Sequence, residues 1–314
     1  MNVLGIETSC DETAAAVVEN GTRIRSSVVS SSLPLHARYG GIIPEIAFRK
    51  QLEALPGVAD CALRRAGISL EDISLVSVTE GPGLAGALLV GVSFARAVAC
   101  SRSLPLVGVN HLHGHIFSAL LDAPAPRFPF VSLVVSGGHT SLYFVKGFKN
   151  MELLGSTRDD ACGEAFDKVA RILGLGYPGG PAIEQRARSG RPGAVKFRCS
   201  NTADPFDFSF SGIKTAVLYH VKRCRRLSPK DVADICASFQ DACMETLVGK
   251  SFCAAAARKT DTIVVGGGVA ANETLRRRFM EQAKVAAMRV LFPRREHCMD
   301  NAAMVAGLGF WLRK

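Results

Sequence analysis

The chain has 314 residues, of which 48% are hydrophobic and 21% charged, so it can form two domains with separate cores and is not a disordered chain. Its net charge of +10 is concentrated after residue 130, in clusters at 222–226, 276–278 and 294–295, which favours a polyanionic partner. The ten cysteines form no CxxC pair, the N-terminus lacks the basic flank of a signal peptide, and Arg96 interrupts the apolar run 83–100, so we expect a cytoplasmic protein without a membrane span.

The first half is predicted to begin with three strands. An apolar run at 3–7 leads into the polar turn 8–13 and a second run, and Asn20-Gly21 then predicts a hairpin to the third. A helix at 47–66, a strand at 74–78, a helix at 84–99 and a strand at 106–109 follow. Asp11 and Glu12 place two carboxylates in the first turn, and we take them as candidate catalytic residues rather than turn caps.

The stretch NHLHGHIFSA at 110–119 is predicted to be a helix with His111 and His115 on one face. Packed histidines are the alternative to a metal site, but three of the seven histidines of the chain fall within five residues. A carboxylate as third ligand would suit iron or zinc, and Asp300 is one candidate among many. Leu112 stands where a zinc peptidase of the HExxH type needs its glutamate base, which argues against a metalloprotease.

The second half repeats this plan. Residues 130–157 again indicate a strand, a small polar turn and two further strands. Helices are predicted at 162–173, 212–225 and 230–259, then a strand at 262–267, a helix from Asn272 and a strand at 288–292; 174–181 and 196–209 are predicted loops. The repeat predicts two α/β domains, 1–125 and 126–314, with the last helix packing back toward the first domain and a nucleotide cleft between the halves.

Three glycine-rich or polar turns at strand ends are candidates for binding phosphate through backbone N–H groups. They are 8–13, 136–140 and 266–272. Glycines at 266–268 would let an adenosine approach the backbone. Asp167, Glu184 and Asn272 offer polar side chains that suit ribose or phosphate.

Eight motifs then occur in the order and spacing of one known family: GIETSCDET, HLHGH, SGGHT, GEAFDKVAR, YPGGP, FSFSGIKTAV, GGGVAAN and the Asp of CMDNAAM. From Gly5 to Gly307 the chain resembles the tRNA N6-adenosine threonylcarbamoyltransferases, the TsaD family. The resemblance implies a duplicated actin-like ATPase (RNase H-like) fold, with two similar domains around a nucleotide cleft. It implies transfer of a threonylcarbamoyl group from threonylcarbamoyl-AMP to N6 of the adenosine beside the anticodon, in tRNAs reading ANN codons.

The resemblance also implies the site residues. The metal ligands are His111, His115 and Asp300, for one divalent ion per subunit, iron with zinc as the alternative. Glu184 stands where the family often has a shorter Asp. The adenylate-binding set comprises Val134, Val135, Ser136, Gly137, Gly138, Asp167, Gly180, Glu184 and Asn272.

The implied partners are the tRNA anticodon stem-loop, a paralogous actin-like scaffold subunit and a small ATPase; ATP or ADP is a further candidate for the cleft. An actin-like sugar kinase or ATPase would use the same turns but gives no reason for a histidine pair. A non-catalytic scaffold paralogue is expected to lack the metal ligands. For the late deprotonation of the adenine amine we take Glu12 or Asp11 as the base.

Overall fold

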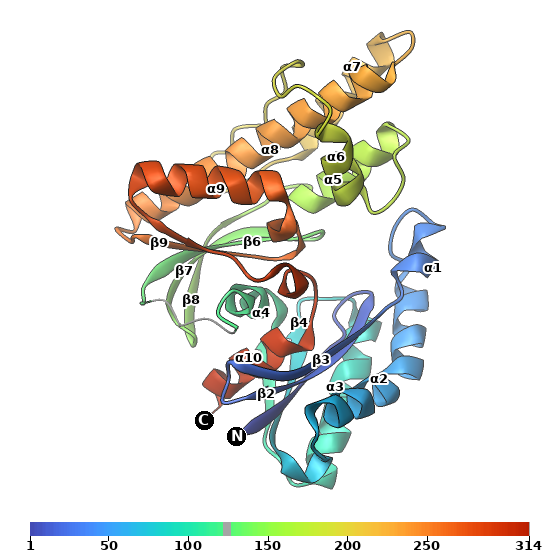
Figure 1. Cartoon of the computed structure of the whole chain (residues 1–314), viewed down its shortest axis with the longest axis vertical. Helices are drawn as coiled ribbons and strands as arrows, with labels where there is room; N and C mark the ends of the chain where they lie inside the picture. The colour runs from blue at the N-terminus through green and yellow to red at the C-terminus, as the bar shows by residue number, and fades with distance from the viewer. Residues whose placement is uncertain (122–126, 314) are drawn as a thin grey trace. The chain divides into compact units, whose positions relative to one another are not determined.

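The computed structural model describes residues 1–121 and 127–313, which form two compact units (Figure 1). Unit 1 comprises Met1–Pro126 and Pro293–Lys314, and unit 2 comprises Arg127–Phe292. The predicted boundary between residues 125 and 126 lies outside the described residues, so the division into functional domains 1–125 and 126–314 stays a prediction.

Unit 1 is built on a mixed sheet of five strands in the order β3-β2-β1-β4-β5. β1, β2 and β3 form an antiparallel meander, while β4 and β5 extend the sheet in parallel. Asn20 and Gly21 both have positive φ, as the predicted hairpin requires. The strands are β1 (Asn2–Glu7), β2 (Glu12–Glu19), β3 (Arg23–Ser31), β4 (Ile73–Gly81) and β5 (Leu106–Asn110).

Helices cover both faces of this sheet. Leu4 and Ile6 of β1 pack with Leu55 of α2 in the main core cluster. Gly5, between them, faces the opposite side, where a Cβ would lie 2.3 Å from the carbonyl oxygen of Ala302, so the absent side chain lets α10 approach the sheet. The helices are α1 (Leu33–Ala37), α2 (Pro44–Ala66), α3 (Ala85–Ser101), α4 (His111–Ser118) and α10 (Ala302–Leu312), with short 3₁₀ turns at Leu70–Asp72 and Arg295–His297.

Unit 2 repeats the same topology, with strands in the order β8-β7-β6-β9-β10 when read from the meander. β6, β7 and β8 are antiparallel, and β9 and β10 continue the sheet in parallel. The predicted internal duplication is therefore confirmed strand by strand. The strands are β6 (Phe130–Val135), β7 (Thr140–Gly147), β8 (Asn150–Ser156), β9 (Thr262–Gly266) and β10 (Arg289–Leu291).

The helices of unit 2 differ from the prediction mainly in one place. Residues 174–181 are not all loop, because α6 begins at Gly179, with Pro178 as its N-cap. The glycines that suggested a loop form the first turn of α6. The N–H of Gly179 donates a hydrogen bond to Asp167 Oδ1. The helices are α5 (Cys162–Ile172), α6 (Gly179–Ala187), α7 (Ser211–Arg223), α8 (Pro229–Ala257) and α9 (Glu273–Ala286), with a 3₁₀ turn at Gly268–Ala271.

In unit 1 the short helix α1 has no counterpart in the prediction. It begins with Pro34 in its first turn and has too few residues to form a periodic apolar pattern. Throughout the described residues, no helix combines the length and apolar character that crossing a membrane would need.

Candidate functional site

The three predicted metal ligands lie together in unit 1. His111 and His115 come from α4, and Asp300 lies two residues before α10. Their ligand atoms are all within 4.8 Å of one another: Asp300 Oδ1 is 3.1 Å from His115 Nε2 and 3.6 Å from His111 Nε2. Ligands about 2 Å from one ion are separated by roughly 3 to 3.5 Å, so the spacing suits a single metal.

Local sequence determines how the two histidines are presented. Asn110 ends β5 and caps α4, since its side-chain oxygen accepts hydrogen bonds from the N–H groups of Leu112 and His113. α4 therefore begins at His111, and His115 follows one turn later on the same face, with the ring centroids 4.6 Å apart. The prediction that the two imidazoles share one helix face is correct.

The burial of His115 supports a metal site. Its side chain is fully buried; among the described residues neither ring nitrogen makes a hydrogen bond, and Nε2 lies 3.1 Å from Asp300 Oδ1. A buried imidazole without hydrogen bonds costs free energy, and a cation between Nε2 and the Asp300 carboxylate would offset part of that cost. The residues present therefore fit a divalent ion.

Glu7 holds His111 in the orientation that a metal ligand needs. Glu7 Oε2 lies 3.1 Å from His111 Nδ1 and accepts a hydrogen bond from Thr79 Oγ1 at 2.6 Å, while Oε1 accepts from the N–H of Ser9 at 2.5 Å. A proton on Nδ1 bonded to a carboxylate leaves Nε2 to bind the metal. Glu7 belongs to the motif GIETSC, but its position inside an apolar strand gave no sign of this role.

Burial and neighbouring charges act in opposite directions on the pKa values of His111 and Glu7. Burial disfavours the imidazolium, but Asp300 and Glu7 outweigh burial and raise the pKa of His111 to about 9. Burial likewise works against the Glu7 carboxylate, but His111 outweighs it and holds the pKa of Glu7 below its usual value. The group as a whole attracts positive charge.

Of the two predicted catalytic carboxylates, Asp11 lies in the turn before β2 and Glu12 is the first residue of that strand. Asp11 is buried, and Glu12 is half-buried with Oε1 accepting a hydrogen bond from Ser31 Oγ at 3.2 Å. Burial, and then the charges of Asp11 and Asp300, raise the pKa of Glu12 to about 9. Glu12 is thus within electrostatic reach of the metal group, and it is a stronger base than an ordinary carboxylate.

One residue outside the prediction fixes this turn. Gln51 of α2 is fully buried, and its Nε2 lies 2.9 Å from the carbonyl oxygen of Cys10, 3.0 Å from that of Glu12 and 3.3 Å from that of Thr8. Backbone carbonyls in a tight turn otherwise lose their hydrogen bonds on burial. The sequence signal that could have revealed this role of Gln51 was a polar residue on the apolar face of a predicted helix.

In unit 2 the residues predicted to bind adenylate surround the end of β6. Val134 and Val135 are fully buried inside the sheet, so only their backbone is available, and their effect is to hold the turn that follows. Gly137 and Gly138 are exposed in that turn, and a Cβ on either would meet nothing. Their N–H groups are open to an anion.

Close backbone contacts by two glycines outside the predicted set pack neighbouring segments against the turn 136–140. Gly267 has φ of +94°, and a Cβ there would lie 2.4 Å from the carbonyl oxygen of Val135. Gly163 donates its N–H to the carbonyl oxygen of Ser136 at 3.2 Å, which sets the start of α5 against the turn. Glycine is required at both positions because no side chain fits.

The predicted polar side chains all make structural hydrogen bonds, one each for Asp167 and Glu184 and two for Asn272. Asp167 Oδ1 accepts from the N–H of Gly179 at 2.7 Å, and Gly180, next in α6, has open space beside it. Glu184 Oε1 accepts from the N–H of Glu273 at 2.7 Å. Asn272 caps α9 through Leu275 N–H and donates to Gln240 Oε1 at 2.9 Å, so its amide is committed to the fold. Gln240 was not predicted.

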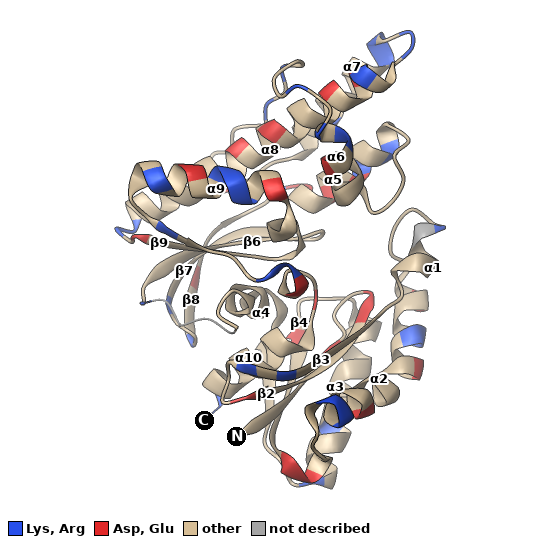
Figure 2. Ribbon diagram, viewed as in Figure 1, with Lys and Arg blue, Asp and Glu red and all other residues tan. Residues whose placement is uncertain are grey.

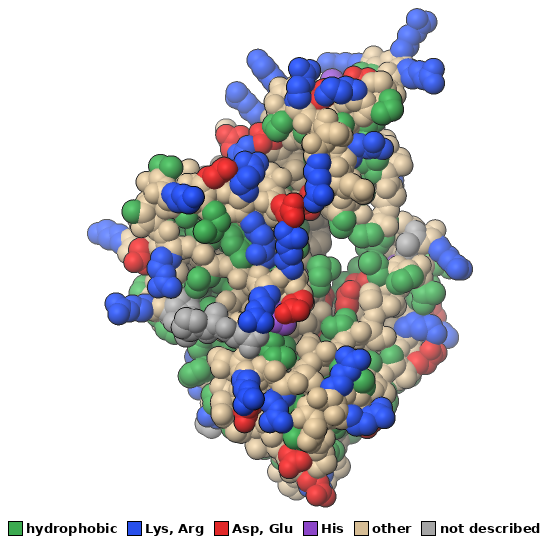
Figure 3. All heavy atoms as spheres, in the orientation of Figure 1, with side chains coloured by type: hydrophobic (Ala, Val, Ile, Leu, Met, Phe, Trp, Pro, Cys, Tyr) green, Lys and Arg blue, Asp and Glu red, His purple; other side chains and the backbone are tan. Residues whose placement is uncertain are grey.

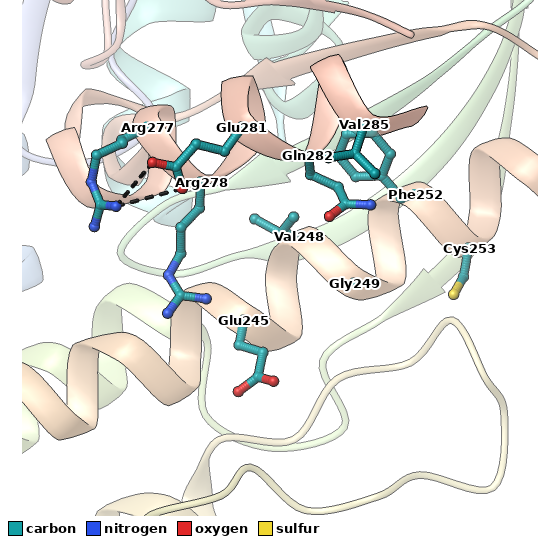
Figure 4. A pocket seen from close by; sticks show the side chains of 10 residues that line it. All are labelled: Glu245, Val248, Gly249, Phe252, Cys253, Arg277, Arg278, Glu281, Gln282 and Val285. Carbon is teal, nitrogen blue, oxygen red and sulfur yellow. Dashed lines mark hydrogen bonds and ion pairs between the residues drawn. The ribbon is translucent and has the colours of Figure 1, made fainter. Parts of the chain in front are cut away.

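A separate concavity of unit 2 contains none of the predicted residues. It lies between α8 and α9, and Figure 4 shows Arg277 turned toward Glu281 beside the apolar side chains of Val248 and Phe252. Its lining therefore gives no support to the predicted chemistry.

Comparisons with known proteins agree in sequence and in fold. The sequence model of the TsaD family, described as tRNA N6-adenosine threonylcarbamoyltransferase, matches residues 23–307. A curated relative with that description from Symbiobacterium thermophilum is 52% identical over 310 residues, 99% of this chain and 91% of the relative. Another from Moorella thermoacetica is 48% identical over 312 residues, with the same coverage.

Among solved structures, HypF from T. kodakarensis has a TM-score of 0.68 at 14% identity, over 98% of this chain and 47% of that chain. Component A of (R)-2-hydroxyglutaryl-CoA dehydratase from Acidaminococcus fermentans has a TM-score of 0.58 at 14% identity, over 99% of this chain and 98% of that one. At such identities the likeness concerns the fold alone, and it confirms the predicted duplicated actin-like fold.

Proposed function

This chain belongs to the TsaD family of tRNA N6-adenosine threonylcarbamoyltransferases and transfers threonylcarbamoyl groups to tRNA adenosine, and we propose that the donor is threonylcarbamoyl-AMP. The proposed acceptor is N6 of the adenosine beside the anticodon in tRNAs reading ANN codons. The observation that carries the proposal is the buried group of His111, His115 and Asp300 with Glu7 behind it. A sugar kinase or a non-catalytic scaffold has no need of such a group.

The reaction needs an activated electrophile, because the lone pair of the exocyclic amine is delocalised into the adenine ring. A divalent ion, iron or alternatively zinc, held by His111, His115 and Asp300 would supply a Lewis acid for the carbamoyl carbonyl or the departing phosphate. Glu7 contributes by fixing the His111 ring so that Nε2 faces Asp300. The buried His115 ring, whose Nε2 faces Asp300 Oδ1 at 3.1 Å without forming a hydrogen bond, supports this assignment.

Glu12 is the proposed base, with Asp11 as the alternative. As the N6–carbamoyl bond forms, the bond from the carbamoyl carbon to the phosphate oxygen of AMP breaks. The amine becomes acidic only as the new bond forms, and its proton passes to the carboxylate. Without a cation, burial and then the charges of Asp11 and Asp300 raise the pKa of Glu12 to about 9; a divalent ion at Asp300 would lower this pKa toward neutrality, where the ionised carboxylate can accept the proton.

Unit 2 is proposed to hold the AMP part of the donor. The exposed N–H groups of Gly137 and Gly138 suit the phosphate. Asp167 and Glu184 each use one oxygen for a helix N-terminus, which leaves the other for a ribose hydroxyl. Gly180 and Asn272 complete the proposed set, Asn272 by positioning the start of α9.

The proposed partners are the anticodon stem-loop of tRNA, a paralogous actin-like scaffold subunit and a small ATPase, and the proposed location is the cytoplasm. A target base in a single-stranded loop can be unstacked at modest cost. ATP or ADP is proposed as an alternative occupant of the nucleotide site.

A reconstituted transfer reaction tests the proposal. The chain, with the subunits that co-purify with it, is incubated with threonylcarbamoyl-AMP and an ANN-reading tRNA, and nucleosides are analysed by mass spectrometry. We expect threonylcarbamoyladenosine from the native tRNA and none from a transcript with guanosine at the target position. The Asp300→Asn variant should lose both bound metal and product, while a metal-loaded wild-type chain without product would contradict the proposal.

A further inference from the structure

Six exposed cations gather at one end of α7 although they come from two separate parts of the sequence. Lys222 and Arg223 end α7, and Arg225 and Arg226 follow in the connection to α8. Lys196 and Arg198 lie in the loop 196–200. Figure 2 shows Lys and Arg at the end of α7 and in the adjoining connection, and in Figure 3 their side chains extend into solvent.

A buried aromatic contact joins the two parts. Phe197 is buried, and its ring lies edge-on to His220 of α7 with the centroids 5.9 Å apart. Lys196 and Arg198 flank Phe197 in sequence, and His220 precedes Lys222 by two residues. The contact therefore places the loop 196–200 beside the C-terminal part of α7. We define the α7 basic surface as the exposed cations of these two segments, residues 196, 198, 222, 223, 225 and 226.

The cations of the α7 basic surface are unneutralised. Within the described ranges, none of the six lies within 4.0 Å of a carboxylate, whereas neighbouring cations such as Lys230 and Arg191 pair with Asp234. The adjacent acid Asp231 accepts hydrogen bonds from Ser228 N and Oγ at 2.8 and 2.7 Å, capping α8. Six like charges held together without counter-charges repel one another, and this repulsion is relieved when a polyanion binds.

An exposed aromatic side chain accompanies these charges. Tyr219 is 58% exposed, and it precedes Lys222 and Arg223 by three and four residues, so it lies on the same side of the helix. Within α7, all of which the structure describes, Tyr219 is the only exposed large hydrophobic side chain. An isolated aromatic ring beside cations suits stacking on an RNA base or ribose, whereas a membrane surface would require several apolar side chains.

We propose that the α7 basic surface binds the phosphate backbone of the tRNA substrate, a proposal that rests on the proposed function for the identity of the polyanion. Each phosphate neutralised by a Lys or Arg releases a condensed counterion, so the surface contributes affinity that falls steeply with salt and carries no base specificity. Its effect is on tRNA capture and on the KM for tRNA, and it leaves the chemical step unchanged.

Two matched triple variants test this. The test variant is Arg223→Ala, Arg225→Ala, Arg226→Ala; the control removes the same charge at three exposed cations elsewhere, Arg65→Ala, Lys284→Ala, Arg289→Ala. Binding of a full-length tRNA is measured from 50 to 300 mM salt, with circular dichroism to verify folding. We expect the slope of log Kd against log salt to fall by about 2 to 3 in the test variant and by less than 1 in the control.

Further variants distinguish charge from structure. The conservative triple Arg223→Lys, Arg225→Lys, Arg226→Lys should restore the salt slope, because a phosphate contact needs only the charge. Tyr219→Ala should weaken binding roughly 5- to 100-fold without changing the slope, since a stacked base is worth about 1 to 3 kcal/mol.

Kinetics separate this inference from the proposed function. In the transfer reaction the test variant should raise KM for tRNA at least about tenfold with kcat within twofold of wild type. Equal slopes and equal KM values in test and control variants would overturn the inference while leaving the proposed function intact. Absence of transfer by the wild-type chain would overturn the proposed function instead, and the salt slopes would still decide whether this surface binds RNA.

Discussion

At the scale of single residues, the proposed base can be tested separately from the candidate metal ligands. Glu12 is held by Ser31 and lies beside Asp11, and it is not one of the three predicted metal ligands. We therefore predict that Glu12→Gln lowers the single-turnover rate of transfer by about 10²- to 10⁴-fold, the range of general base catalysis, with metal content and donor affinity close to wild type. Rapid-quench measurements check this, and an unchanged rate would eliminate Glu12 as the base.

Gln51 gives a second prediction at this scale. Gln51→Met keeps the volume of the side chain but removes the donor that serves the carbonyl oxygens of Cys10 and Glu12. Unfolding free energy should fall by about 1 to 3 kcal/mol, and kcat should fall with it because the turn carries Glu12. The neighbouring Leu52 is 65% exposed, so Leu52→Met serves as the control in urea titrations. Equal midpoints for the two variants would refute the positioning role.

The sequence allowed the candidate metal ligands to be predicted but not the residues that orient them. His111 and His115 were predicted from their helical spacing, and Asp300 was predicted from the resemblance. Glu7 and Gln51 act through contacts with residues far away in the chain, His111 and the turn 8–12, and such long-range contacts leave no local pattern. Asn272 was recognised as a helix start, but its bond to Gln240 required the fold.

At the scale of elements, the packing of α10 on the sheet links the fold to the metal group. Gly5→Ala would place a Cβ 2.3 Å from the carbonyl oxygen of Ala302 and 2.7 Å from the N of Ala306, so α10 must shift. We predict a loss of roughly 1 to 3 kcal/mol in stability and weaker metal binding, because Asp300 lies only two residues before this helix. Gly57→Ala, in the exposed interior of α2 with nothing within 4 Å, should instead stabilise by about 0.5 to 1 kcal/mol. Calorimetry and metal titration compare the two, and equal metal affinity would contradict the coupling.

The start of α7 depends on Asp159. Its carboxylate accepts hydrogen bonds from the N–H groups of Phe210 and Ser211 and from two serine hydroxyls. Burial opposes the charge, but the bonds to Ser209 and Ser211 outweigh it and lower the pKa of Asp159. The stabilisation is therefore complete above the unfolded pKa near 4 and is lost as pH falls through the lower folded pKa.

We accordingly predict that Asp159→Ala reduces the melting temperature at pH 7 and that the difference from wild type shrinks below about pH 4. Asp60→Ala, which breaks an exposed pair with Arg64, is the matched control and should change stability by less than about 1 kcal/mol at either pH. A difference for Asp159→Ala that persists at pH 2.5 would show that the effect does not depend on the carboxylate charge.

Element prediction succeeded where the apolar pattern was long and failed where it was short or rich in glycine. In the described ranges, the ten strands occur in the predicted order along the chain, and the Asn20-Gly21 turn has the backbone that its residues favour. α6 was missed because its N-terminus is glycine with Asp167 as an external cap, and α1 because five residues cannot display a period. External capping and short helices are decided by tertiary contacts.

At the scale of the whole molecule, the duplicated topology explains why two turns, one in each unit, occupy equivalent places in the two sheets. They have diverged in chemistry: the turn of unit 1 carries Asp11 and Glu12, while the turn of unit 2 carries exposed glycines. Sequence alone was sufficient for the fold class because the repeat of strand, turn and hairpin is visible without any contact information.

The central claim is that this chain adds the threonylcarbamoyl group to tRNA adenosine. The most direct measurement is mass spectrometry of tRNA nucleosides from cells depleted of this protein and complemented with wild type or with Asp300→Asn. We predict that threonylcarbamoyladenosine disappears on depletion, returns with the wild-type chain and stays absent with the variant. Persistence of threonylcarbamoyladenosine in the depleted cells would contradict the account.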